Sequence, residues 1–252
     1  MTAQKQSGIA LVTGGTRGIG EAICKMFSGE GYQVVTTFRN KERERQAREW
    51  QSRMADDGLE IDLVKMDVSD MRSCEIAADE LLQRYGRLDV LVNNAGITRD
   101  SVMKKMPIEA WQEVIHTNLD GVFNVTRCFL DTFLAQHYGR IINISSINAQ
   151  KGQFGQVNYS AAKAGIHGFT KALAQETARK GITVNTISPG YVETDMIMAI
   201  DEKIREQIKA QIPVGRFGQP EEIARLVAFL ANEQSSFITG ADFSINGGMF
   251  MH

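Results

Sequence analysis

The chain has 252 residues, a formal net charge of −2, and 43% hydrophobic residues. The near-neutral charge argues against a general nucleic-acid surface, which requires a basic field. No run of about 18 apolar residues occurs, so no membrane-spanning helix is expected, and the apolar run at Ile9–Val12 is too brief for the core of a signal peptide.

Short apolar runs alternate with longer amphipathic segments along the chain. The runs predict seven strands: Ile9–Thr13, Gln33–Phe38, Ile61–Met66, Val90–Asn93, Arg140–Ser145, Thr183–Ser188 and Asp242–Asn246. The segments predict helices at roughly Ile19–Gly29, Lys41–Asp57, Ser69–Tyr85, Trp111–Gln136, Tyr159–Arg179 and Glu221–Asn232.

This alternation predicts an α/β fold of the Rossmann-like, doubly wound kind: a seven-stranded parallel sheet with helices on both faces. The chain contains no linker, repeat or low-complexity tract, so we expect one catalytic domain over residues 1–252. Without a separate substrate domain, the substrate is expected at the carboxyl ends of the strands.

A glycine-rich turn joins the first predicted strand to the first predicted helix. Its glycines are spaced G-x-x-x-G-x-G rather than G-x-G-x-x-G. In this position backbone N–H groups and the helix dipole favour a phosphate. A plain surface turn is the alternative, and a hydroxyl and a cation in the same turn argue against it. The predicted dinucleotide contacts are Gly14, Thr16, Arg17, Gly18, Ile19 and Gly20.

The residues that follow the second strand bear on the choice of coenzyme. An acid there would bind a ribose 2′-hydroxyl and repel a 2′-phosphate. This chain has Arg39 instead, with Arg17 as a second cation, so the sequence favours NADPH over NADH. The alternative is that Arg39 is only a solvated side chain.

The ends of the third and fourth strands are also expected to contact the coenzyme. Asp67, followed by Val68, ends the third strand and is placed to contact adenine. Asn94, Ala95 and Gly96 end the fourth strand, where small residues would let the backbone approach the coenzyme closely.

Tyr159 and Lys163 are four residues apart on a predicted helix and therefore share a face. A phenol with a pKa of about 10 exchanges its proton poorly near neutrality, and a neighbouring ammonium would lower that pKa. Tyr-x-x-x-Lys alone is usually structural. Ser146 at the end of a strand supports a site that moves hydride and a proton to or from a carbonyl, with Ser145 as the competing serine.

At this point the chain resembles the short-chain dehydrogenase/reductase family over essentially its whole length. The matching elements are Gly14/Gly18/Gly20, Asn93-Asn94-Ala95-Gly96, Asn118, Ser146, Tyr159, Lys163 and Ser188-Pro189-Gly190. The resemblance implies Tyr159 as general acid in reduction, with Ser146 orienting the carbonyl. It also implies that Lys163 tunes Tyr159 and holds the nicotinamide ribose, and that Asn118 supports a water relay to Lys163.

The same resemblance brings further expectations. It places Pro189 and Gly190 in the coenzyme site, and the family's serine-to-tyrosine spacing favours Ser146 over Ser145. It implies a homotetramer. Three cysteines, an odd number and far apart, predict no disulfide framework and a cytoplasmic protein, and four histidines without ligand spacing predict no metal site.

Four segments, 96–100, 104–106, 150–156 and 189–191, resemble the acetoacetyl-CoA reductases of polyhydroxybutyrate synthesis, close relatives of 3-oxoacyl-carrier-protein reductases. This implies an acyl-CoA substrate, reduced from a short 3-oxoacyl-CoA to the (R)-3-hydroxyacyl-CoA. By the same resemblance, the substrate site is lined by Asp100, Lys105, Gln153, Phe154, Gln156 and Tyr191. Two alternatives stay open: a 3-oxoacyl-carrier-protein reductase, and a non-catalytic dinucleotide-binding regulator.

Overall fold

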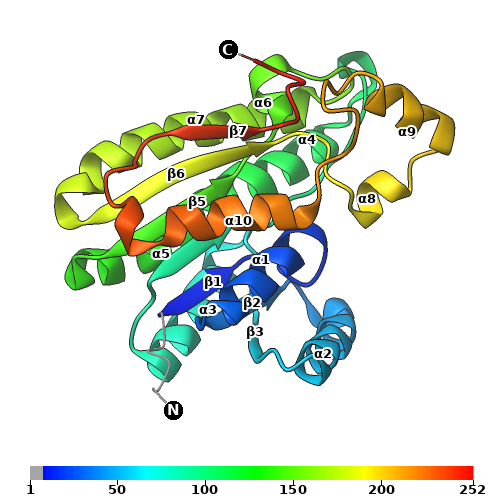
Figure 1. The fold of residues 1–252 in the computed structure, drawn as a ribbon. Helices are drawn as coiled ribbons and strands as arrows, with labels where there is room; N and C mark the ends of the chain where they lie inside the picture. The colour runs from blue at the N-terminus through cyan, green and yellow to red at the C-terminus, as the bar shows by residue number, and fades with distance from the viewer. Residues whose placement is uncertain (1–7, 252) are drawn as a thin grey trace.

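The computed structural model describes residues 8–251 and places seven parallel strands in one sheet (Figure 1). The strand order is β3-β2-β1-β4-β5-β6-β7, which confirms the predicted fold class. The strands are β1 (Ile9–Val12), β2 (Gln33–Phe38), β3 (Ile61–Lys65), β4 (Val90–Asn93), β5 (Gly139–Ile144), β6 (Ile182–Pro189) and β7 (Asp242–Ile245).

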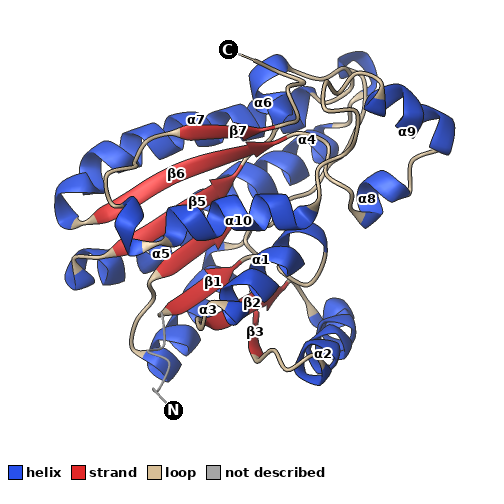
Figure 2. Cartoon of the chain, viewed as in Figure 1, coloured by secondary structure: helices blue, strands red, loops and turns tan. Residues whose placement is uncertain are grey.

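Helices cover both faces of this sheet (Figure 2). One face is covered by α1 (Gly18–Gly29), α2 (Lys41–Asp56) and α10 (Pro220–Ala231). The other is covered by α3 (Met71–Tyr85), α5 (Gly121–Gln136) and α7 (Val157–Thr177). The remaining helices are α4 (Ile108–Ile115), α6 (Ile147–Lys151), α8 (Asp195–Met198) and α9 (Glu202–Lys209), and Figure 1 shows α8 and α9 standing apart from the sheet.

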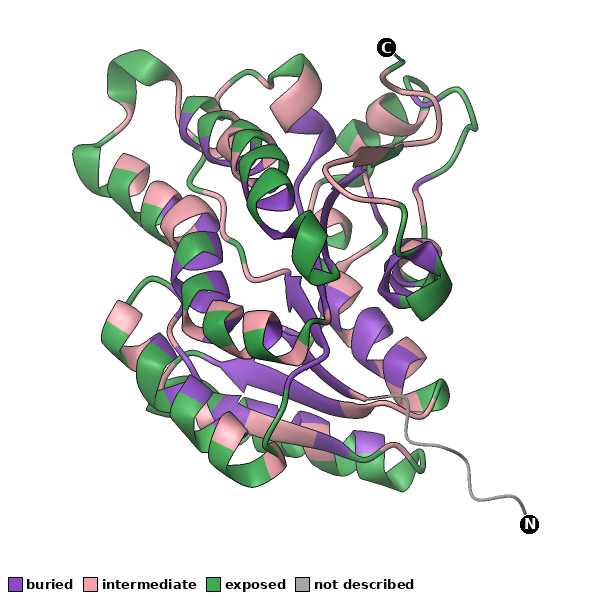
Figure 3. Ribbon diagram, turned by 90° about the vertical axis from the view of Figure 1, so that its left-hand side faces the viewer, coloured by how far each residue is buried: buried purple, intermediate pink, exposed green. Residues whose placement is uncertain are grey.

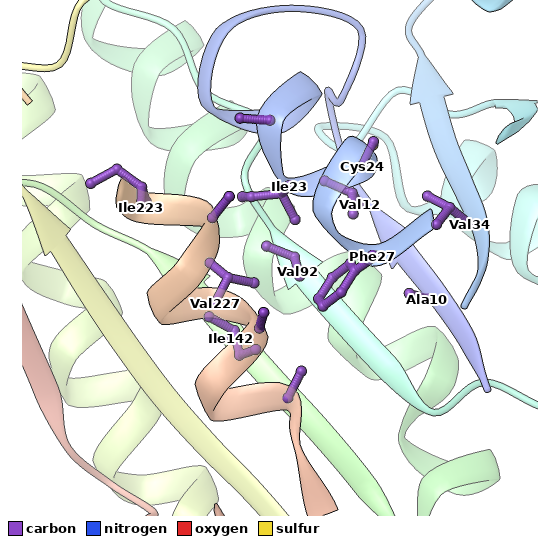
Figure 4. Packing of buried hydrophobic residues seen from close by; sticks show 14 of the residues in the cluster. Ala10, Val12, Ile23, Cys24, Phe27, Val34, Val92, Ile142, Ile223 and Val227 are labelled. Atoms are coloured by element: carbon purple, nitrogen blue, oxygen red, sulfur yellow. The ribbon is translucent and has the colours of Figure 1, made fainter. Parts of the chain in front are cut away.

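Two hydrophobic cores lie on the two faces of the sheet, whose strands are largely buried (Figure 3). In the first, α1 and α10 pack together over the central strands, as Figure 4 shows for Phe27, Ile23 and Val227 around Val92 and Ile142. Phe27 is fully buried, a burial that contributes about 1.5–3 kcal/mol to folding. This packing holds the amino end of α1 beside the carboxyl end of β1.

The reversal of strand order at β1 and β4 positions a binding crevice. The chain runs from β1 outward to β3 and then returns to add β4 on the other side of β1. In such sheets the crevice opens at the carboxyl ends of the strands beside this reversal. Among the described residues, no helix is both long and apolar enough to cross a membrane.

The predicted long helix Trp111–Gln136 is confirmed as one helical path, which contains a π-helical turn. Residues 116–120 form a π-helical turn between α4 and α5, and α4 already begins at Ile108 after Pro107. Such turns occur frequently at functional sites. The apolar spacing of the segment predicts the continuous helix but not the π-helical turn inside it, which tertiary contacts accompany.

The short helices α6, α8 and α9 were also absent from the predicted elements. Helices of four to eight residues lack the two to three turns of periodic pattern on which such predictions depend. Ser146 caps α6, with its Oγ accepting from the Asn148 N–H at 3.1 Å. This short helix therefore begins directly at one of the predicted site residues.

Candidate active site

The glycine-rich turn is held against β2 by two threonine hydroxyls. The Gly14 N–H donates to Thr37 Oγ1 at 3.0 Å, and the Gly15 N–H donates to Thr36 Oγ1 at 2.8 Å. Gly14 has a φ of +66°, a left-handed conformation that side chains disfavour. Its backbone is thus fixed in a conformation that requires glycine.

The turn also closes tightly on the end of β4. The Asn94 side chain donates to Thr13 O at 2.9 Å and Gly14 O at 3.2 Å, and Thr13 Oγ1 accepts from the N–H groups of Asn94 and Ala95. A Cβ on Gly20 would lie 2.6 Å from both Asn94 Nδ2 and Gly14 O. No side chain fits there, so the close packing of the turn against the end of β4 requires glycine at this position.

The first turn of α1 is free to bind an anion. Its N-cap is Arg17, which is exposed and makes no capping side-chain hydrogen bond. The first N–H groups of a helix have no intrahelical acceptor and attract negative charge. Ile19 packs against the core beneath, which anchors this turn. The residues present therefore fit a dinucleotide pyrophosphate.

The predicted adenosine-side residues meet at the ends of β2 and β3. Arg39 Nε lies 3.9 Å from Asp67 Oδ2, and the Arg39 side chain is 59% exposed. The other carboxylate oxygen of Asp67 accepts from the N–H and the hydroxyl of Ser69. Val68 is buried against Gly121. A pair at this distance and exposure is weak, so the Arg39 guanidinium remains able to bind a further anion.

Ser146, Tyr159 and Lys163 come together at the carboxyl end of β5. The Ser146 hydroxyl hydrogen-bonds the Tyr159 phenol. Lys163 Nζ lies 5.8 Å from the centroid of the Tyr159 ring and donates to Ile144 O at 2.7 Å. The one-face prediction for Tyr159 and Lys163 is therefore confirmed.

The Ser145 hydroxyl bonds a different part of α7 from the Tyr159 phenol. It donates to Lys163 O at 2.9 Å and lies 2.9 Å from His167 Nε2. Both serines follow β5 and contact α7, but Ser146 is also the N-cap of α6, and this places its hydroxyl at Tyr159. The structure thus brings Ser146, not Ser145, to Tyr159.

The pKa values differ from the sequence-based expectation. Burial raises the pKa of Tyr159, the Ser146 hydrogen bond opposes this rise, and the Asp100 charge adds to it. Burial also lowers the pKa of Lys163 to about 8. The expected lowering of the phenol pKa is therefore not present in the protein alone, because desolvation outweighs the hydrogen bond from Ser146.

Asn118 lies in the π-helical turn and is fully buried. Its Oδ1 accepts from the Ile97 N–H at 2.8 Å and its Nδ2 donates to Ile97 O at 2.8 Å. A Cβ on Gly96 would lie 3.0 Å from Asn118 Oδ1 and 3.6 Å from Lys163 Nζ. Asn118 and Lys163 thus line the same side of the Gly96 backbone.

Two predicted substrate residues are linked directly. Gln156 Nε2 donates to Asp100 Oδ2 at 2.9 Å. Burial, followed by the Asp100 charge, raises the pKa of Tyr191, so this carboxylate acts on the phenols of both Tyr159 and Tyr191. Asp100, Gln156 and Tyr191 therefore lie around the Tyr159 phenol.

The other predicted substrate and coenzyme residues lie at the margin of the region around Tyr159. Gln153 accepts from Lys151 Nζ at 2.8 Å, and Phe154 is 87% exposed. Lys105 is exposed, in a 3₁₀ turn. Pro189 ends β6, and a Cβ on Gly190 would lie 2.8 Å from Asn246 Cα, so this backbone also packs too closely for a side chain.

Sequence reasoning missed residues whose hydrogen bonds support the backbone and side chains of the site. Thr36 and Thr37 support the glycine turn. Asn158, fully buried, donates to Arg99 O and Ala110 O and accepts from the Tyr159 N–H. Asn148 contacts Ser146. The available signal was that a polar residue stands near each motif residue in the sequence. The partners of these polar residues are far away in sequence, so the signal did not identify their contacts.

Residues 8–251 contain no group of three or more His, Cys, Asp or Glu side chains arranged to hold a metal ion. The cysteines Cys24 and Cys74 are buried, and burial raises the pKa of each thiol to about 12.

Comparison with known proteins places this site in a family. A family profile described as "Enoyl-(Acyl carrier protein) reductase" matches residues 14–250. An acetoacetyl-CoA reductase of Allochromatium vinosum is 52% identical over 97% of this chain and 99% of its own length. Another from Cupriavidus necator is 51% identical over 96% of this chain and 98% of its own length.

A 3-oxoacyl-acyl-carrier-protein reductase of Aquifex aeolicus is 43% identical over 99% of this chain and its own full length. These matches extend over nearly the whole chain, and the profile match at residues 14–250 spans the positions of the glycine turn and of Ser146, Tyr159 and Lys163. The chain therefore belongs to the short-chain dehydrogenase/reductase family, and it is an oxidoreductase that uses a nicotinamide dinucleotide and a small-molecule substrate.

Proposed function

We propose that this protein reduces acetoacetyl-CoA, and other short 3-oxoacyl-CoA thioesters, to the (R)-3-hydroxyacyl-CoA with NADPH, and so supplies polyhydroxybutyrate synthesis. The observation that carries the proposal is the hydrogen-bonded Ser146–Tyr159 pair above Lys163. It occurs in a chain that is 51–52% identical, over nearly its whole length, to acetoacetyl-CoA reductases such as those of Allochromatium vinosum and Cupriavidus necator.

The two hydroxyl groups act on the ketone oxygen. When bound, the reduced nicotinamide supplies a hydride to the carbonyl carbon. Ser146 donates a hydrogen bond that orients the carbonyl, and Tyr159 delivers the proton to its oxygen. General acid catalysis of this kind typically contributes about 10²–10⁴-fold in rate. Burial raises the pKa of Tyr159, which keeps the phenol protonated and ready to donate.

Lys163 supports this proton transfer. Its ammonium is buried, bonded to Ile144 O and close to the Tyr159 ring. As Tyr159 loses its proton, the positive charge stabilises the phenolate more strongly than it would in water. We also assign Lys163 to the nicotinamide ribose. Asn118, pinned to Ile97 beside Lys163, supports the water relay that returns a proton.

NADPH is the proposed coenzyme because two exposed arginines flank the adenosine end. Arg39 follows β2 directly and Arg17 precedes α1. Asp67 pairs with Arg39 only at 3.9 Å, which leaves the guanidinium for a 2′-phosphate. Bidentate binding of phosphate is the interaction for which arginine is best suited.

The proposed substrate site combines polar and apolar contacts. Gln153, Gln156 and Tyr191 would hydrogen-bond the thioester or the pantetheine amide, and the exposed Phe154 would cover a short acyl chain. Asp100 holds Gln156, and Lys105 is an exposed cation for the phosphates of CoA. We further propose a cytoplasmic homotetramer in which residues 1–252 act as one catalytic domain.

A 3-oxoacyl-carrier-protein reductase is the second candidate, supported by the Aquifex aeolicus relative. An acidic carrier protein would require a basic patch near the entrance. Lys104 and Lys105 are exposed there, but Arg99 is paired with Glu113 at 2.8 Å, which weakens such a patch and favours the CoA thioester.

Steady-state kinetics test these candidates together. NADPH and NADH are compared against acetoacetyl-CoA, longer 3-oxoacyl-CoA thioesters and an acyl-carrier-protein thioester. The proposal expects the highest kcat/KM with NADPH and acetoacetyl-CoA. A higher kcat/KM for the carrier-protein thioester favours the second candidate, and tight NADPH binding without turnover on any thioester favours a non-catalytic regulator.

A further inference from the structure

The two hydroxyl groups of the proposed site are placed by two different helices. Ser146 is the N-cap of α6, and Tyr159 lies in the first turn of α7, whose N-cap is Gln156. Helix α6 has five residues, too few for a helix to be stable alone. Its position, and with it that of Ser146, therefore depends on contacts with the rest of the fold.

Asn148 contacts both helix starts. Its backbone N–H donates to Ser146 Oγ at 3.1 Å, and its side-chain Nδ2 donates to Gln156 Oε1 at 2.9 Å. The residue is 9% exposed. The side-chain bond is thus a brace from the first turn of α6 to the cap of α7, next to the Ser146–Tyr159 pair.

Asp100 fixes the direction of this brace. Gln156 Nε2 donates to Asp100 Oδ2 at 2.9 Å, and an ionised carboxylate can only accept. Gln156 must therefore turn its carbonyl oxygen toward Asn148, which must in turn offer its NH₂ group. This order leaves Asn148 Oδ1 buried and without a hydrogen-bond partner in the described part of the chain.

An unpaired buried oxygen is unfavourable. The hydrogen bond from Asn148 Nδ2 to Gln156 Oε1 therefore holds the amide in this orientation. We propose that Asn148 is a positioning residue for ketone reduction: it braces α6 against α7 and so sets the Ser146 hydroxyl relative to Tyr159. It acts through Ser146 and does not itself contact the substrate. This inference rests on the proposed function.

The variant Asn148→Asp tests the brace, because it replaces one NH₂ group with oxygen at almost constant shape. At pH 7 the new carboxylate would face Gln156 Oε1, acceptor against acceptor, and the brace is lost. A small misplacement of a reacting group can cost up to about 100-fold in rate. We expect kcat for acetoacetyl-CoA to fall about 10–100-fold, with the Kd for NADPH unchanged.

The pH profile separates positioning from a merely structural role. A protonated carboxyl can donate to Gln156 as the amide does, and burial at this position raises the pKa of an aspartic acid above its ordinary value of about 3.9. The ratio of variant to wild-type kcat should therefore rise as pH falls from about 7 to about 5. Asn148→Leu has a similar shape but donates at no pH, so its kcat should be low with a flat ratio.

Gln234→Glu serves as the charge-matched control. Gln234 is exposed and lies beside Glu233 at the amino end of β5, where Arg140 donates to Glu233 O, far from the carboxyl ends that hold the site. It should keep wild-type kcat at every pH. Melting temperatures of all variants are measured in parallel.

Each outcome is decisive. Wild-type kcat in Asn148→Asp, a flat pH ratio for that variant, or a lowered melting temperature with unchanged kcat overturns the positioning role. A wild-type protein that does not reduce acetoacetyl-CoA with NADPH overturns the proposed function instead, and is recognised before any variant is compared.

Discussion

The variant Lys163→Met exchanges a buried ammonium for an apolar chain of similar length. Lys163 is 4% exposed, and burial lowers its pKa from 10.5 to about 8. Each pH unit of difference corresponds to about 1.4 kcal/mol, so at neutral pH the buried charge destabilises the folded protein by about 3 kcal/mol. Methionine removes this penalty but leaves Ile144 O, the present acceptor, unpaired at a cost of about 1–3 kcal/mol.

These two terms are similar in size, so the pH dependence is more informative than the stability at one pH. Below pH 8 the lysine is protonated in both the folded and the unfolded protein, and the penalty is complete. Between pH 8 and 10.5 the folded protein releases the proton that the unfolded chain retains, so wild-type stability rises. The stability of Lys163→Met relative to wild type should therefore fall by about 2 kcal/mol from about pH 7.5 to about pH 9.5.

Urea unfolding at fixed protein concentration gives the free energy of unfolding of each protein at each pH. Lys171→Met, which removes an exposed ammonium from the same helix, is the control and should follow the wild-type pH dependence. A difference between Lys163→Met and wild type that stays constant over this range would refute the buried-charge reasoning. Turnover of Lys163→Met should be lowered by about 10² or more below about pH 8, where the wild-type lysine carries the charge that stabilises the phenolate.

Three further predictions concern the same site. Tyr159→Phe should lower kcat by about 10²–10⁴ while NADPH binding, measured by fluorescence titration, persists; wild-type turnover would exclude Tyr159 as the general acid. Gly20→Ala places a Cβ 2.6 Å from Gly14 O, so we expect unfolding free energy to drop by about 1–3 kcal/mol and NADPH Kd to rise at least about tenfold; unchanged Kd would mean that the turn does not bind the coenzyme. Arg39→Ser should raise KM for NADPH by about tenfold and leave KM for NADH nearly unchanged; an equal effect on both would show that Arg39 does not contact the 2′-phosphate.

The fold was largely readable from the sequence. Each predicted strand is confirmed within about two residues at its ends, since apolar runs such as Val90–Asn93 between helical segments have few alternative interpretations. The π-helical turn at residues 116–120 was not readable. The buried contacts of Asn118 with Ile97, 21 residues away, accompany the π-helical turn there, and sequence periodicity does not register them.

Part of the candidate site was also readable from the sequence. Four-residue spacing on a helix predicts that Tyr159 and Lys163 share a face, because helix geometry is local. The pKa of the phenol was not predictable in this way. Its direction depends on how much water the surrounding side chains exclude, and burial of Tyr159 outweighs the hydrogen bond from Ser146.

The sequence by itself determined the succession of strands and helices along the chain, the glycine turn before α1 and the Tyr159–Lys163 pair. Each of these depends on residues close together in the chain. Only the tertiary structure decided that Ser146 and not Ser145 meets Tyr159, and that Asn148 links α6 to Gln156 and Asp100. These contacts join β5, α6, α7 and the loop after β4, and their geometry exists only once the sheet and both helical layers have packed.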